Sequence, residues 1–118
     1  MKVRIKITSN FKKEAEPLLK RYKSLVPELE NLEKELSKNP TLGTPLGNNI
    51  FKIRIKISSK GKGKSGGARV ISYLETELII NLEPIETETI VNLISIYDKS
   101  ETASISTKEL QQLIANLQ

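Results

Sequence analysis

Two stretches of the chain alternate between basic residues and β-branched or aromatic ones. Residues 2–7 read Lys-Val-Arg-Ile-Lys-Ile, and residues 50–57 read Ile-Phe-Lys-Ile-Arg-Ile-Lys-Ile. A period of two with this composition predicts strands that have one apolar and one solvated face. Residues 68–75 predict a third strand, which can extend through Ile80. Residues 90–97 are apolar on both faces and predict a central strand that is covered on both sides.

The apolar spacing becomes helical after the first strand. Residues 11–22 place Phe, Ala, Leu and Tyr side chains on one helical face, and Ser9 or Asn10 can cap this helix. Pro17 predicts a kink or a late start, because proline lacks the N–H that an inner helical turn uses. Residues 25–36 carry four leucines at spacings of four, three and four. They predict a second amphipathic helix, so that the two helices form a hairpin.

Segments rich in Gly, Pro, Asn or Ser separate the other elements. Residues 41–49 and 58–67 have this composition and predict loops. Residues 107–117 predict a final helix with an apolar stripe, which Ser106 caps with Glu109 three positions later.

This order of elements predicts one α+β domain over residues 1–118. It comprises an N-terminal strand, an α-helical hairpin, an antiparallel β-sheet of about four strands in total and a C-terminal helix. No internal repeat or linker divides the chain. The hairpin is expected to cover one face of the sheet, which leaves Lys52, Arg54 and Lys56 on the other face.

The amino acids that the chain lacks exclude several kinds of catalytic and metal-binding site. The chain has no Cys and no His, which excludes a disulfide framework, Cys-based zinc sites, and the Ser-His and Cys-His nucleophile pairs. The only Asp is Asp98, and the Glu residues are spread over helices and a hairpin turn, so a carboxylate metal site is not expected. We expect neither a metal nor another cofactor.

Charge is segregated along the chain. Residues 36–74 carry eight Lys or Arg and no acidic residue, whereas residues 75–118 carry eight Asp or Glu and two Lys. An acid-free basic block predicts a surface that faces a polyanion, and nucleic acid is favoured over membrane because no basic amphipathic helix accompanies it. The N-terminus lacks the apolar run of a signal peptide and no stretch is long enough to span a membrane, so the expected location is cytoplasmic.

A glycine- and lysine-rich segment at residues 61–67 resembles a phosphate-binding loop only superficially. It reads Gly-Lys-Gly-Lys-Ser-Gly-Gly, but Ser58 stands where the Walker pattern needs glycine. The following residues 69–73 favour a strand, whereas phosphate binding needs a helix N-terminus. A nucleotide-binding site is therefore not expected here.

The basic side chains indicate a cationic site instead. If the last three predicted strands are neighbours, five side chains converge near the strand ends: Lys52, Arg54, Arg69, Tyr97 and Lys99. Fixed cations can stabilise the pentacovalent transition state that forms when a ribose 2′-hydroxyl attacks the adjacent phosphorus of RNA. A lysine with a lowered pKa can act as the base, and Tyr or a charged Lys as the donor to the leaving 5′-oxygen. Basic residues at alternate positions of a strand are also common on the solvated face of an amphipathic sheet. The strand pattern alone therefore does not establish a site for RNA.

Three segments resemble the RelE/HigB group of type II toxins. They are residues 63–73 (Gly-Lys-Ser-Gly-Gly-Ala-Arg-Val-Ile-Ser-Tyr), residues 96–101 (Ile-Tyr-Asp-Lys-Ser-Glu) and residues 51–56 (Phe-Lys-Ile-Arg-Ile-Lys). The resemblance spans essentially the whole domain, and the Gly-Lys-Ser-Gly-Gly-x-Arg-Val-Ile block is its most specific part. It implies a RelE-like fold and a metal-independent endoribonuclease (an mRNA interferase) that enters the ribosomal A site and cleaves translated mRNA. It also implies a cognate antitoxin protein that wraps and inhibits the toxin.

The resemblance implies roles for single residues as well. Lys52 and Arg54 match two catalytic basic residues of the group, Arg69 matches the arginine that stabilises the phosphate, and Lys99 lies near a further catalytic arginine. RelE has a catalytic tyrosine closer to its C-terminal end. No tyrosine follows Tyr97 here, so Tyr97 is expected to replace it. Further lysines on the basic strand and in the loop after it are expected to contact RNA: Lys56, Lys60, Lys62 and Lys64.

Two other functions remain open. The chain could be a related ParE-like toxin, which inhibits gyrase by binding, or a non-catalytic module that binds RNA or the ribosome. The second alternative has few aromatic platforms for stacking bases, since the chain contains two Phe, three Tyr and no Trp.

Overall fold

The computed structural model describes residues 2–58, 66–80 and 85–117, with only the backbone described at 78–80 and 85–86. The elements in chain order are β1 (Lys2–Ile7), α1 (Ser9–Arg21), α2 (Leu25–Lys38), β2 (Thr44–Gly47), β3 (Ile50–Ile55), β4 (Ala68–Ile80), β5 (Ile85–Asp98) and α3 (Thr107–Ala115). The α+β class is as predicted. None of the helices in these ranges combines the length and apolar character that crossing a membrane requires.

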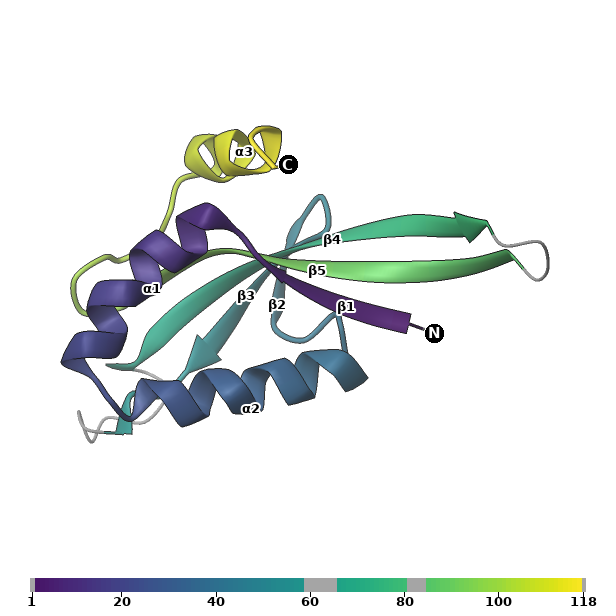
Figure 1. Ribbon diagram of the computed structural model, residues 1–118. Coiled ribbons are helices and arrows are strands. Elements are labelled where there is room, and N and C mark those ends of the chain that lie inside the picture. Colours follow the sequence, from purple (N-terminus) through teal and green to yellow (C-terminus); the bar gives the residue numbers. More distant parts are fainter. Residues whose placement is uncertain (1, 59–65, 81–84, 118) are drawn as a thin grey trace.

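The sheet differs from the predicted one in strand number and layout. In the described residues it has five strands in the order β1-β5-β4-β3-β2 (Figure 1). β1 runs parallel to β5, and the other neighbours are antiparallel, so the prediction of about four antiparallel strands was wrong. The additional strand β2 lies in the segment at 41–49 that was predicted as a loop. It pairs with β3 as an edge strand, which is the place in a sheet where its Pro45 is tolerated.

β4 and β5 are long and reach beyond the rest of the sheet. They pair from Ala68 opposite Asp98 to Ile80 opposite Ile85, whereas β3 follows β4 only as far as Tyr73. The predicted extension through Ile80 is therefore confirmed, and the predicted start of the last strand at residue 90 was too late. The distal strand segments at 75–80 and 85–89, here called the arm, project from the body in Figure 1.

α1 forms without the predicted interruption. The helix runs through Pro17 to Arg21, so the kink or late start expected at Pro17 was wrong. Pro17 is exposed, so water can bond the carbonyl that the missing proline N–H would have served. The cap is Thr8 and neither Ser9 nor Asn10, because the Thr8 hydroxyl accepts a hydrogen bond from the Phe11 N–H at 3.2 Å.

The two predicted amphipathic faces are confirmed in α2 and α3. The leucine stripe of α2 buries three of its four members, Leu25, Leu32 and Leu36. In α3 the Ser106 hydroxyl accepts a hydrogen bond from the Glu109 N–H at 3.1 Å, as its capping pattern predicts.

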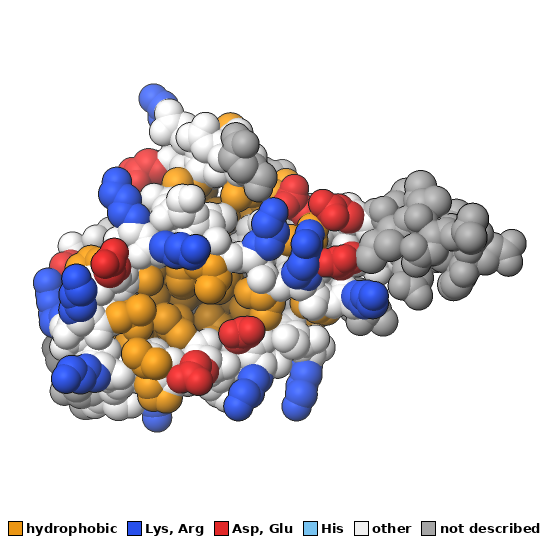
Figure 2. Space-filling model, viewed as in Figure 1, with side chains coloured by type: hydrophobic (Ala, Val, Ile, Leu, Met, Phe, Trp, Pro, Cys, Tyr) orange, Lys and Arg blue, Asp and Glu red, His pale blue; other side chains and the backbone are white. Residues whose placement is uncertain are grey.

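Helices pack on both faces of the sheet, and each face has its own apolar core. The larger core joins α1 and α2 to one face and includes Phe11, Leu36, Ile53, Val70 and Ile96. The smaller core joins Leu110 of α3 to the opposite face at Ile50, Ile71, Ile94 and Tyr97. Figure 2 shows that apolar side chains remain visible in the hollow between α1 and α2. Because α3 packs at Ile50, Ile71, Ile94 and Tyr97, it covers part of the sheet face that was expected to be solvated.

Candidate active site

Three of the predicted site residues form one row across three strands. Arg54 of β3 lies opposite Arg69 of β4, and Arg69 lies opposite Tyr97 of β5. Residues that are paired in this way project from the same face of a sheet, with Cβ atoms roughly 5 Å apart. The alternation of β3 places Ile53 and Ile55 in the core under the helices, so the row lies on the opposite face, together with α3.

The start of the row is fixed by an unusually close approach of two strands at Gly67. A Cβ atom at this position would collide with the carbonyl oxygen of Ile55 and would lie 2.8 Å from the Cα atom of Lys56. Only glycine lets β3 and β4 come this close immediately before Arg69. The Gly67 carbonyl also accepts a hydrogen bond from the Lys99 N–H at 3.0 Å, which ties the end of β5 to the same point. The sequence shows this glycine, but the reason for it appears only in the structure.

Arg69 and Tyr97 are both deeply buried, at 5% and 6% exposure. Burial lowers the pKa of Arg69, the neighbouring charge of Arg54 lowers it further, and Tyr97 opposes both effects. Burial raises the pKa of Tyr97, and the positive charge of Arg69 partly offsets this increase. Arg69 donates a hydrogen bond from Nη1 to the Ala68 carbonyl at 3.1 Å, which holds its guanidinium group in place. The row therefore concentrates positive charge beside a phenol that keeps its proton at neutral pH.

Arg54 and Lys52 provide the more open side of the row. Arg54 is exposed, whereas Lys52 is half-buried and lies one pair further along the same face, opposite Ile71. On the other side, the Tyr97 ring belongs to the apolar cluster that contains Leu110 of α3. The row is therefore open at Arg54 and covered near Tyr97, on the side of α3.

Lys99 lies in the turn that follows β5, where its side chain already has a partner. Its Nζ donates a hydrogen bond to the Ala103 carbonyl at 2.8 Å. The turn itself is held by Asp98, whose carboxylate accepts hydrogen bonds from the Tyr22 hydroxyl at 3.2 Å and the Ser100 hydroxyl at 2.8 Å. Asp98 is 3% exposed, and its hydrogen bonds hold the chain next to Tyr97 in place. A single Asp before Lys-Ser is visible in the sequence, but its pairing with Tyr22, 76 residues earlier in the chain, is not.

The remaining predicted RNA contacts are not part of the row. Lys56 lies just past the end of β3, and its Nζ is 4.0 Å from Oε1 of Glu28 on α2. Its side chain therefore extends toward the helix layer. Three other lysines, Lys60, Lys62 and Lys64, lie outside the described residues.

The arrangement suits an anionic ligand better than a metal ion. Among the residues that the structure describes, no three acidic side chains gather as the ligands of an ion would. The two arginines of the row offer planar donor groups that can bind two oxygens of a phosphate each. No known family model matches the sequence.

Proposed function

We propose that this protein is a metal-independent endoribonuclease toxin of the RelE/HigB kind, which cleaves mRNA on the ribosome. The observation that carries the proposal is the row of Arg54, Arg69 and Tyr97 on three adjacent strands. A phosphodiester fits such a row, because it needs paired donors for its oxygens and a proton donor for its leaving group. The resemblance of the surrounding sequence to this toxin group supports the same assignment.

In the proposed reaction the ribose 2′-hydroxyl passes its proton to solvent water as its oxygen attacks the adjacent phosphorus. A 2′,3′-cyclic phosphate forms, and the bond from phosphorus to the 5′-oxygen breaks. Arg69 stabilises the charge that develops on the non-bridging oxygens, and its buried position strengthens this interaction. Tyr97 donates its proton to the leaving 5′-oxygen. The phenol is protonated at neutral pH, as a proton donor must be. Burial raises its pKa, so it releases the proton only as negative charge develops on the leaving oxygen. Exposed Arg54 and half-buried Lys52 guide the phosphate toward Arg69.

The test compares wild-type protein with Arg54→Ala and Arg69→Ala, and with Arg4→Ala as a control that removes an arginine from a strand outside the row. Growth after brief induction and the mapped 5′ ends of mRNA are the readouts, and circular dichroism checks the fold of each variant. We expect cuts within translated codons that vanish in both row variants and persist in Arg4→Ala. Arg54 is exposed, so its variant stays informative even if loss of the buried Arg69 destabilises the protein.

Three results would overturn the proposal. If both row variants fold and remain fully toxic, the row is not the site. If wild-type protein produces no RNA ends but inhibits DNA supercoiling, it acts like a ParE toxin; if it only binds RNA, it is a binding module.

The same row supports a proposal about the inhibitor. A cognate antitoxin would neutralise the toxin by covering Lys52, Arg54 and Arg69 with an acidic segment or with a helix that blocks them. Such binding should weaken markedly as salt rises from about 0.05 to 0.5 M, because exposed charge pairs are screened. An affinity that does not depend on salt concentration would contradict this electrostatic account.

A further inference from the structure

The arm has an outer strand edge that no other described strand covers. β3 pairs with β4 only up to Tyr73, and a last hydrogen bond of 2.9 Å runs from the Leu74 N–H to the Asn49 carbonyl. Beyond this point the described part of the sheet provides no neighbour for β4 on that side. A hollow of about 570 Å³ lies at the same place and is lined by Pro40, Thr41, Asn49, residues 73–76 and Thr89.

The direction of the Leu74 N–H shows which backbone groups face outward. In a regular strand the N–H and C=O of every second residue point to the same edge. Because Leu74 points toward β3, the backbone groups of Thr76, Leu78 and Ile80 point to the uncovered edge. Those of Glu75 and Glu77 point to β5. The arm therefore presents three residues of unused strand edge, which is the feature that strand addition by another chain exploits.

The arm is also strongly acidic. Its two strand segments, residues 75–80 and 85–89, contain four Glu and no Lys or Arg. Glu75 and Glu77 project from one face of β4, and Glu77 lies directly opposite Glu88 of β5. Like charges in this position repel each other, so the arm is stabilised by a basic neighbour.

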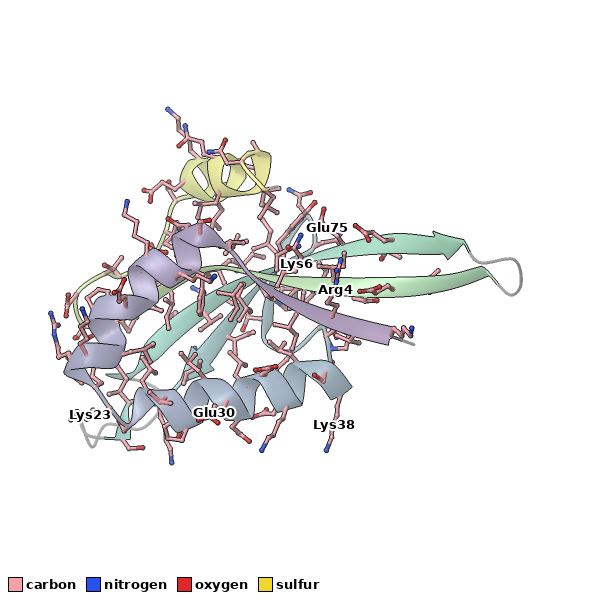
Figure 3. The ribbon with its side chains drawn as sticks, in the orientation of Figure 1. Arg4, Lys6, Lys23, Glu30, Lys38 and Glu75 are labelled. Carbon is pink, nitrogen blue, oxygen red and sulfur yellow. The ribbon has the colours of Figure 1, made fainter. Side chains whose placement is uncertain are left out.

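β1 already supplies such a neighbour on the other side of the arm. Its sequence alternates basic and β-branched residues, and it pairs with β5 from Lys2 opposite Glu88 onward. Arg4 bridges both acidic strands, with Nε 2.8 Å from Oε1 of Glu88 and Nη2 3.8 Å from Oε2 of Glu77. Figure 3 shows Arg4 and Lys6 close to Glu75 at the base of the arm, and Figure 2 shows basic and acidic side chains next to each other there.

We propose that the free edge of β4 at residues 75–80 binds an extended segment of a partner protein, which carries Lys or Arg at alternate positions. The partner would add a strand to the arm as β1 does, with its basic side chains beside Glu75 and Glu77. The acidic surface disfavours RNA, and two copies of this chain would bring their own Glu75 and Glu77 together at this edge. The proposal goes beyond the ribonuclease function and does not depend on it.

The test uses full-length protein and a synthetic capped peptide with the sequence of residues 2–7. Binding is followed by NMR through the backbone amide signals of the arm. We expect the amides of Thr76, Leu78 and Ile80 to shift and to become protected from exchange. A control peptide with Glu in place of each Lys and Arg should bind at least about tenfold more weakly.

Two matched proline variants locate the edge. Thr76→Pro removes one outward N–H at the free edge of β4 and adds a ring there, so it should weaken peptide binding at least about tenfold. Thr87→Pro removes an N–H that points to the β1 side of the same arm, and it should leave peptide affinity unchanged within about twofold. Both positions are exposed, and neither N–H belongs to the ladder between β4 and β5.

Three outcomes would overturn the proposal. The first is no binding at about 1 mM peptide. The second is binding that shifts amide signals outside the arm, or binding whose affinity does not change in Thr76→Pro. The third is self-association that Thr76→Pro abolishes, since the occupant would then be a second copy of this chain. Because these readouts involve neither RNA nor the arginine row, their failure leaves the ribonuclease proposal untouched.

Discussion

Replacing Gly67 by alanine should separate the two strands that carry the arginine row. The new Cβ would collide with the Ile55 carbonyl oxygen and lie 2.8 Å from the Cα atom of Lys56. Both are backbone atoms at the end of β3 or just beyond it, so no side-chain rotation can relieve the contact. Overpacking costs about 1–3 kcal/mol, and the lower entropy of the unfolded alanine chain offsets about 0.4–1 kcal/mol of it. Because the contacts are with backbone atoms, the upper end of the overpacking range applies, and we expect a net loss of about 2 kcal/mol in the free energy of unfolding.

Gly47→Ala is the matched control for this variant. Gly47 has a positive φ of 91°, but a Cβ there would have no atom within 4 Å. It therefore introduces backbone strain of about 1–2 kcal/mol without a collision, less the same entropic gain. Urea unfolding should give a midpoint for Gly67→Ala about 1 M below that of the wild type, with a smaller decrease for Gly47→Ala. RNA cleavage should fall more in Gly67→Ala, because its displaced backbone lies next to Arg69. A midpoint for Gly67→Ala that equals the wild-type value would refute the close approach of β3 and β4.

Three further changes test other parts of the fold. Tyr97→Phe removes a buried phenol whose pKa is raised above its ordinary value of 10.0. The folded state then retains a proton that the unfolded state loses, so wild-type stability should fall more steeply than that of Tyr97→Phe as pH rises above this ordinary value. Equal slopes in chemical denaturation at several alkaline pH values would contradict this. A double-mutant cycle of Arg4→Met and Glu88→Gln should give a coupling energy of about 0.2–1 kcal/mol that decreases with salt, and a value of zero at low salt would show that the pair does not stabilise the arm. Leu36 is 0% exposed and Leu46 is 43% exposed. Leu36→Ala should therefore lower the free energy of unfolding by about 2–5 kcal/mol, whereas Leu46→Ala should change it by less than about 0.5 kcal/mol. Equal stabilities of the two variants in thermal or urea unfolding would contradict the core position of Leu36.

Local sequence patterns were sufficient to predict those features of a strand that depend only on its own residues. The period of two over residues 50–57 predicted which side chains of β3 face the core, and the apolar run at 90–97 predicted an interior strand. The convergence of Arg54, Arg69 and Tyr97 followed from these two patterns once the three strands were taken as neighbours. For this reason the row could be anticipated, although its chemical role stays a proposal.

Features that depend on distant residues could not be predicted in the same way. The alternation of β1 is compatible with either strand direction, and only its partner β5 makes it parallel. The burial of Tyr97 depends on α3, which the sequence showed as amphipathic without indicating which face of the sheet it covers. The length of the arm was underestimated because Thr and Glu dominate residues 86–89, and these residues lack the apolar signal of a core strand.

The pairing of β1 with β5 has a consequence for the order of folding. The Thr8 N–H and hydroxyl both bond the Leu93 carbonyl, which is 85 residues further along the chain. Contacts of this sequence separation require closure of a long loop, and they form late and slowly. During synthesis, β1 precedes its partner β5, so it can join the sheet only after β5 has been made. Tyr97 also belongs to β5, so a nascent chain can form neither the five-stranded sheet nor the row of Arg54, Arg69 and Tyr97 before β5 has been synthesised.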